Sequence, residues 1–129
     1  MSKRIIVNKF GGGILKKDLI PMMVERLQEQ IKDGYYPVVV VSALPGVTDE
    51  LLKGSGKAFI NKLKAKHSRA MIDIGLSEDW QRKTQFELNK LFTSIGKAKK
   101  GSDEMVAYGE KLSATIFSFY LSARGLPAK

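Results

Sequence analysis

The amino-acid sequence predicts an α/β fold that opens with a parallel β-α-β unit and continues into a helix-rich segment. Residues 4–8 and 37–42 are short apolar runs rich in Val and Ile, which is typical of strands. Between them, over residues 18–33, apolar side chains recur at a spacing of three and four, which indicates an amphipathic helix. A strand, a crossover helix and a second strand in this order predict two parallel strands.

The residues at the ends of these elements agree with the prediction. Three consecutive glycines, residues 11–13, end the first strand. Pro21 falls in the first turn of the helix, where a missing N–H is tolerated, and Gly34 provides a C-terminal stop. The second apolar run, which ends at Ser42, is continuous rather than alternating, so we expect a strand buried on both faces.

The remainder of the chain is predicted to be helical. Ser102 is the expected N-cap of the longest helix, with Asp103 and Glu104 placed favourably in its first turn. No linker divides the chain, so residues 1–129 are expected to form one unit. The predicted helices cover residues 46–52, 58–74, 78–95 and 103–124.

The composition narrows the class of protein. With 43% hydrophobic and 27% charged residues among 129, the chain resembles a globular domain. It has no cysteine and a single histidine, His67, so we expect no disulfide framework and no metal-ligating side chains. No apolar run is long enough for a bilayer or a signal peptide, so we expect a cytoplasmic protein without a membrane partner. His67 and Trp80 are expected to be packing or surface residues.

The net charge of +9 is compatible with a polyanionic partner such as nucleic acid. Six basic residues lie between Lys53 and Arg69 with no acidic residue among them. However, this stretch has too few aromatic side chains to stack on bases. We therefore expect a solvated helix face and no nucleic-acid partner.

A phosphate-binding loop is predicted where the first strand ends. Lys9 comes shortly before Gly11, Gly12 and Gly13, and a helix follows. Consecutive glycines let backbone N–H groups approach a ligand, and lysine supplies a compact positive charge. The spacing is neither the Walker pattern nor the dinucleotide-binding pattern. Considered alone, the glycines are equally well explained by an ordinary tight turn.

Two hydroxyl residues are expected beside this loop. Adjacent parallel strands end on the same side of a sheet, and ligands bind at those ends. Ser42 ends the second strand, and the turn after it leads to Thr48. With Lys9 they form one rim suited to a polyphosphate and a second anionic substrate. Each also has a purely structural explanation, Ser42 as a strand end and Thr48 as a helix cap.

Five motifs occur in order along the chain: Lys-Phe-Gly-Gly at 9–12, Val-Val-Val-Ser-Ala at 39–43, Gly-Val-Thr-Asp at 46–49, Gly-Glu-Lys-Leu-Ser-Ala at 109–114 and Gly-Leu-Pro-Ala at 125–128. Together they resemble the aspartate kinases of the amino-acid kinase superfamily. The first motif is shared across the superfamily, whereas the serine-containing and threonine-containing motifs are much more specific. The resemblance spans essentially the entire chain.

The resemblance implies part of the three-layer amino-acid kinase fold. It also implies transfer of the γ-phosphoryl group of ATP, with Mg²⁺, to the side-chain carboxylate of L-aspartate, the first step of lysine, threonine and methionine biosynthesis. By this resemblance Lys9 would neutralise charge on the transferring phosphoryl group, while Gly11 and Gly12 would hold phosphate through their N–H groups. A carboxylate is already a nucleophile at neutral pH, so no general base is required.

The same resemblance implies roles for residues near the substrate. Ser42 would lie between the phosphate and aspartate, and Thr48 would hold an aspartate carboxylate. Glu110 would bind the α-ammonium group of aspartate, and Gly109 beside it would permit close approach of the ligand.

The chain departs from the family pattern in two respects. The family usually continues Lys-Phe-Gly-Gly with Thr-Ser, whereas this chain has Gly13 and Ile14, so two hydroxyls are missing while the N–H of Gly13 remains. The chain is also short, so we expect residues 1–129 to be the N-terminal part of a catalytic domain, without its nucleotide-binding half or ACT regulatory domains. On its own it is expected to be inactive or very weak, and the intact protein to be a homodimer. Another superfamily member, or a non-catalytic phosphate-binding module, remains the alternative.

Overall fold

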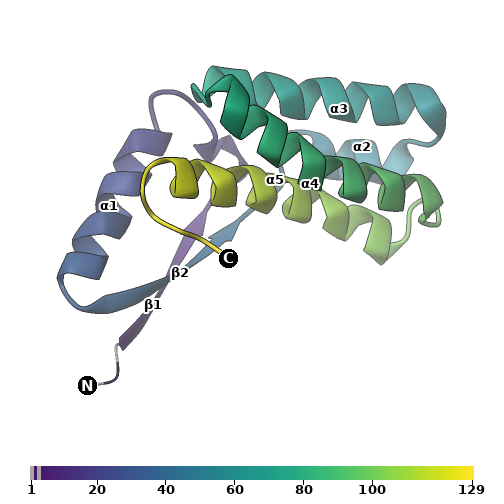
Figure 1. The fold of residues 1–129 in the computed structure, drawn as a ribbon. Helices are drawn as coiled ribbons and strands as arrows, with labels where there is room; N and C mark the ends of the chain where they lie inside the picture. The colour runs from purple at the N-terminus through teal and green to yellow at the C-terminus, as the bar shows by residue number, and fades with distance from the viewer. Residues whose placement is uncertain (1, 3) are drawn as a thin grey trace.

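The chain folds as a short parallel sheet beside a bundle of helices (Figure 1). The computed structural model describes residue 2 and residues 4–129. Each predicted helix and strand is present, with ends that differ from the prediction by a few residues. In chain order the elements are β1 (Arg4–Phe10), the single 3-10 turn η1 (Gly12–Ile14), α1 (Ile20–Lys32), β2 (Tyr35–Val41), α2 (Val47–Lys53), α3 (Gly56–Asp73), α4 (Glu78–Lys97) and α5 (Asp103–Ala123).

The two strands are parallel, as the β-α-β order predicts. Their register runs from Arg4 opposite Tyr35 to Phe10 opposite Val41. One further bond, from the N–H of Ser42 to the carbonyl oxygen of Phe10 at 3.2 Å, continues the pairing past the end of β2. The carboxyl ends of β1 and β2 therefore lie side by side.

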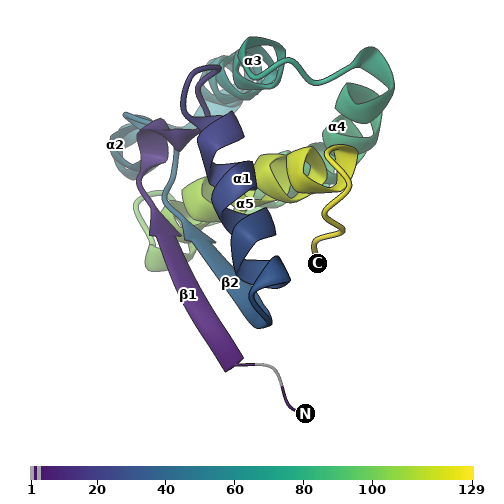
Figure 2. The same cartoon turned by 90° about the vertical axis from the view of Figure 1, so that its left-hand side faces the viewer.

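One face of this sheet is covered by α1 and α5 (Figure 2). Asn8 and Phe10 point to the same face because side chains alternate along a strand. The Asn8 and Gln30 amides exchange two hydrogen bonds of 2.8 Å, which joins β1 to α1. The Phe10 ring packs on that of Phe117 in α5, with ring centres 6.0 Å apart. A helix from each end of the chain thus contacts the same side of β1.

The opposite face of the sheet carries a strip of exposed apolar side chains, and this corrects the expectation that β2 is buried on both faces. Along β2, burial alternates, since both covering helices lie on one side. In the strand register, Ile5 lies opposite Tyr36 and Val7 lies opposite Val38. Val40, which lies opposite Lys9, is the fifth apolar residue on this face. Ile5 is 69% exposed and Val7 is 64% exposed. We call these five apolar residues, Ile5, Val7, Tyr36, Val38 and Val40, the bare strip.

The rest of the chain forms a helical bundle in which α4 and α5 pack closely and α3 packs on α4. Ser102 caps α5 as predicted, because its side-chain oxygen accepts the N–H of Met105 at 3.1 Å. The fully buried side chains at the centre are Leu63, Leu88, Leu112 and Ile116. No helix in the described part of the chain combines the length and apolar character needed to span a membrane.

His67 packs inside this bundle with no exposed surface. Its ring meets Phe92 edge-on, with ring centres 5.9 Å apart, and its Nδ1 donates to the carbonyl oxygen of Leu63 at 2.7 Å. The other ring nitrogen, Nε2, has no hydrogen-bond partner among the described residues. Burial lowers the pKa of His67 from its usual 6.5, and the positive charge of Lys66 lowers it further. The hydrogen bond to the Leu63 carbonyl and the negative charge of Glu50 raise the pKa, but the net shift is downward. His67 is therefore a neutral core residue.

The free energy of unfolding should fall as the pH is lowered from about 7.5 to about 5.5. Once unfolded, His67 regains its usual pKa of 6.5, whereas in the folded chain burial keeps the pKa lower, so the folded chain binds fewer protons below that pH. Because the unfolded state then binds more protons, stability is lost by up to about 1.4 kcal/mol per pH unit below the unfolded pKa. Urea unfolding followed by circular dichroism across this range measures the slope.

The matched control is His67→Met, which keeps a similar volume and cannot bind a proton. Its stability should change much less over the same pH range. Equal slopes for the two proteins would show that groups other than His67 cause the pH dependence.

Candidate functional site

The predicted phosphate loop joins the end of β1 to α1. Lys9 is the next-to-last residue of β1 rather than the residue after it, because the strand continues through Phe10. Its exposed side chain shares the face of the bare strip, opposite Val40. Gly11 precedes η1 and its carbonyl oxygen accepts the N–H of Ile14 at 3.1 Å, so Gly12 and Gly13 form a tight turn.

The sequence predicts that Ser42 lies beside this loop, and the strand pairing brings the two together. Ser42 directly follows β2, is half-buried, and donates its N–H to Phe10, the residue immediately before Gly11. The chain then continues through Ala43 and Leu44, which are both buried, into α2. The first strand end and the second are thereby fixed to one another by backbone bonds.

Gly109 brings α5 into close contact with the segment that follows Ser42. A carbon atom placed where a side chain would begin on Gly109 would lie 3.0 Å from Cβ of Ala43, 3.1 Å from Cδ1 of Leu51 and 3.2 Å from Cγ1 of Val47. Gly109 is buried by these neighbours. We expected the glycine to permit close approach of a ligand, and that expectation is wrong: the space is taken by the chain itself.

This contact gathers the remaining predicted site residues. Ser42 precedes Ala43, Thr48 follows Val47, and Glu110 follows Gly109, so each stands next to a member of one buried cluster. Thr48 and Glu110 are exposed, on the first turn of α2 and on the facing helix α5. Three segments far apart in sequence therefore meet at one buried contact, and each carries a predicted site residue next to it.

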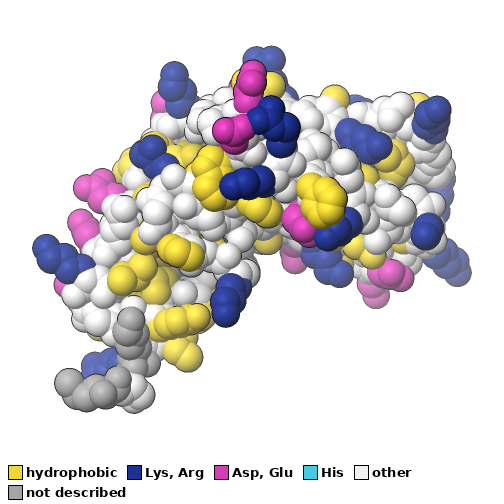
Figure 3. Space-filling model, viewed as in Figure 1, with side chains coloured by type: hydrophobic (Ala, Val, Ile, Leu, Met, Phe, Trp, Pro, Cys, Tyr) yellow, Lys and Arg dark blue, Asp and Glu magenta, His cyan; other side chains and the backbone are white. Residues whose placement is uncertain are grey.

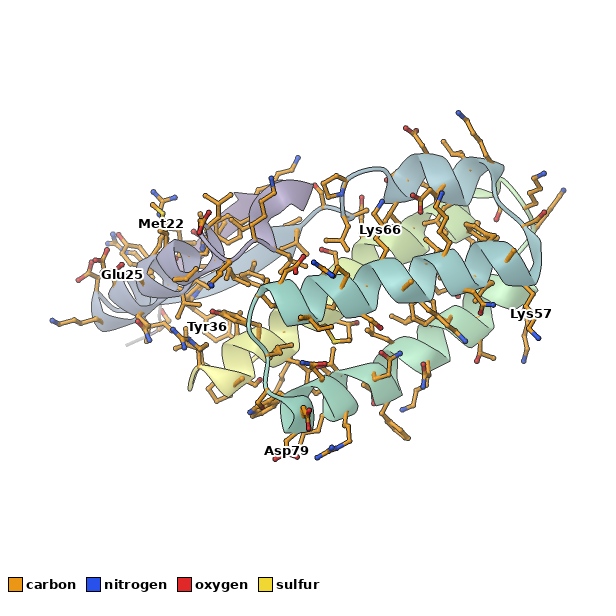
Figure 4. The ribbon with its side chains drawn as sticks, turned by 90° about the horizontal axis from the view of Figure 1, so that it is seen from above. Met22, Glu25, Tyr36, Lys57, Lys66 and Asp79 are labelled. Carbon is orange, nitrogen blue, oxygen red and sulfur yellow. The ribbon has the colours of Figure 1, made fainter. Side chains whose placement is uncertain are left out.

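Lys66 also belongs to this neighbourhood, although the sequence assigned it to a solvated basic helix face. Its ammonium lies 3.1 Å from the Glu50 carboxylate, between α3 and α2 (Figure 4). It also lies 3.2 Å from where a side chain would begin on Gly46, the residue that opens α2 with a positive φ of 83°. Spacing along α3 could not predict this pair, because the partner comes from another helix.

The other five basic residues of that stretch are exposed: Lys53, Lys57, Lys62, Lys64 and Arg69. On the face seen in Figure 3, Lys and Arg side chains are spread across the surface rather than gathered in one patch. Lys9 forms no ion pair with the described residues, so its charge is available to an anion. Over the same residues, no three Asp, Glu, His or Cys side chains gather as a metal site.

A hollow of about 500 Å³ lies elsewhere, between β2 and the last residues of the chain. Its walls are mainly apolar, and none of the predicted site residues contributes to them. The hollow therefore has no part in the candidate site, which is an open surface at the carboxyl end of the sheet.

A glycine-rich turn that follows a lysine-bearing parallel strand, with Ser42 bonded to the same strand end, is an arrangement suited to binding phosphate groups. Residues 4–129 match the Amino acid kinase family, and the chain belongs to that family.

Within this family the chain is similar to aspartokinases, which confirms the resemblance in the sequence. It is 30% identical over 135 residues to an aspartokinase of Chlamydia trachomatis, covering 96% of this chain and 29% of that protein. It is 28% identical over 139 residues to the chloroplastic aspartokinase 2 of Arabidopsis thaliana, covering 95% of this chain and 25% of that protein.

A solved structure shows the same fold. It is E. coli aspartokinase III in complex with lysine and aspartate, matched with a TM-score of 0.69 and 20% identity over 97% of this chain and 30% of that one. The chain thus spans less than a third of the length of the relatives it matches.

The Gly109→Ala variant should lower the free energy of unfolding by about 1 kcal/mol. The added methyl group would be pressed against Ala43, Val47 and Leu51, and overpacking costs about 1–3 kcal/mol, which exceeds the roughly 1 kcal/mol gain in helix propensity. Urea unfolding compares the variant with the unmodified chain.

Gly96→Ala is the control, because Gly96 is also helical and has nothing within 4 Å of an added methyl group. It should raise stability by about 0.5–1 kcal/mol. A gain of equal size at both positions would contradict the close contact inferred for Gly109.

Proposed function

We propose that this chain is the N-terminal part of the catalytic domain of an aspartate kinase, which transfers the γ-phosphoryl group of ATP to the side-chain carboxylate of L-aspartate. The observation that carries the proposal is a pair of tertiary links: Ser42, the residue after β2, bonds to the last residue of β1, and the segment after it packs with α2 against Gly109, the neighbour of Glu110. The similarity to aspartokinases supports aspartate as the acceptor. The reaction would take place in the cytoplasm as the first step of lysine, threonine and methionine biosynthesis.

The chemistry that these residues offer is positioning and charge neutralisation. Phosphoryl transfer has little covalent work for the protein, so catalysis depends on holding the reactants in line and offsetting negative charge. Lys9 supplies a positive charge without a competing carboxylate, and Gly11, Gly12 and Gly13 supply backbone N–H groups. Mg²⁺, carried by the phosphates of ATP, would neutralise further charge.

The acceptor side of the site uses hydroxyl and carboxylate groups. Ser42 would lie between phosphate and aspartate, Thr48 would donate to an aspartate carboxylate, and the Glu110 carboxylate would accept from its α-ammonium group. A protein that recognises both charged ends of aspartate needs such a pairing of a donor with an acceptor. Further parts of the site would come from other chain segments, and the intact protein would be a homodimer.

The proposal predicts aspartate-dependent consumption of ATP by the full product of the gene that encodes this chain. Lys9→Met should lower kcat by about a hundredfold or more, since one charge that stabilises the transition state is lost. Glu110→Gln should raise the KM for aspartate about tenfold or more with a smaller effect on the KM for ATP. Coupled measurement of ADP release gives both constants.

Lys32→Met and Glu104→Gln are the controls, because both side chains are exposed and lie on helices that also border the site. They should leave kcat and both KM values within about twofold. Turnover with glutamate, acetylglutamate or carbamate but not with aspartate would replace the proposal by another member of the amino acid kinase family. No turnover with any acceptor would favour a non-catalytic phosphate-binding module.

A further inference from the structure

A second lysine reaches the glycine loop from its far end. Lys16 follows η1, and its side chain folds back over Gly13. The position where a side chain would begin on Gly13 lies 3.8 Å from Cε and 3.9 Å from Nζ of Lys16. A larger residue at position 13 would extend beyond that first carbon and displace the lysine. The position of the Lys16 side chain therefore depends on residue 13 being a glycine.

The backbone of Lys16 is held firmly between η1 and α1. Its N–H donates to the carbonyl oxygen of Ile14 at 2.8 Å, and its carbonyl oxygen accepts from Leu19 and Ile20 at 3.1 and 3.0 Å. Ile14 and Leu15 are both buried in the core. Since the segment is anchored on both sides of Lys16, only the long side chain is left to move.

The charges around the loop favour an anion. Neither Lys9 nor Lys16 forms an ion pair with any residue in the described part of the chain. Lys9 lies on the strand that leads into the three glycines, and the Lys16 side chain lies over Gly13 on the side that leads to α1. Two ammonium groups without carboxylate partners beside a glycine backbone leave positive charge that a polyphosphate would neutralise.

We propose that Lys16 is a second phosphate-binding residue, whose side chain lies over the glycine loop where Gly13 has no side chain. Its ligand would be the polyphosphate chain of a nucleoside triphosphate, held between Lys9 and Lys16 over the glycine loop. The inference rests on the proposed function, which makes this loop the phosphate site. A lysine binds phosphate as a point charge and needs no fixed hydroxyl geometry, so a flexible side chain over Gly13 is sufficient.

The test uses inorganic triphosphate as the probe, with binding to the chain measured by calorimetry at low, constant ionic strength. Lys16→Met should weaken binding about tenfold, because a charge-assisted contact is lost. Lys17→Met is the matched control: it removes the same charge from the adjacent exposed residue and should change the affinity by less than about twofold. Gly13→Val, which adds bulk without a hydroxyl, should weaken binding as Lys16→Met does, and combining the two should add little.

The outcomes separate this inference from the proposed function. Equal losses for Lys16→Met and Lys17→Met would mean that only net charge matters, and would overturn the role of Lys16. Binding that is unaffected by Lys16→Met would overturn it as well, and so would the absence of saturable binding to the unmodified chain. Triphosphate binding that depends on Lys16, in a protein that phosphorylates no aspartate, would support the role of Lys16 while the proposed acceptor fails.

Discussion

The arrangement of this chain depends on the close contact of α5 with the segment between Ser42 and α2. At Gly109 the helix approaches Ala43, Val47 and Leu51 so closely that even a methyl group would press against them. The contact fixes α2 against α5, and the bond from Ser42 to Phe10 fixes the same segment to the end of β1. Together these links place the start of α2 and the Gly109 turn of α5 beside the two strand ends.

The elements of the fold could be predicted because their signals are local. Ser102 caps the helix that follows it, and Gly34, with a φ of 90°, ends the turn after α1. The burial of β2 could not be predicted in the same way, since a run of valines looks the same whether a sheet is covered on one face or on two. His67 shows a similar limit: it lies in a stretch rich in lysine and arginine, while the bundle interior surrounds its ring.

For the candidate site, the motifs predicted which backbone segments meet but not how side chains cross between them. Lys9, Ser42 and Thr48 follow from strand ends and a helix start. Lys66 and Lys16 do not, because one pairs with a carboxylate on another helix and the other folds back over a glycine. Such placements depend on tertiary structure, which spacing along one helix or one loop does not contain.

The bare strip has a consequence for how the protein behaves as a colloid. The charge of +9 makes copies of the chain repel one another when little salt is present. At an ionic strength of about 0.15 M the repulsion reaches only about 8 Å, which is too short to keep apolar surfaces such as Ile5 and Val7 apart. Added salt should therefore promote clustering of this chain, so that dilute buffers, rather than physiological ones, would keep it dispersed.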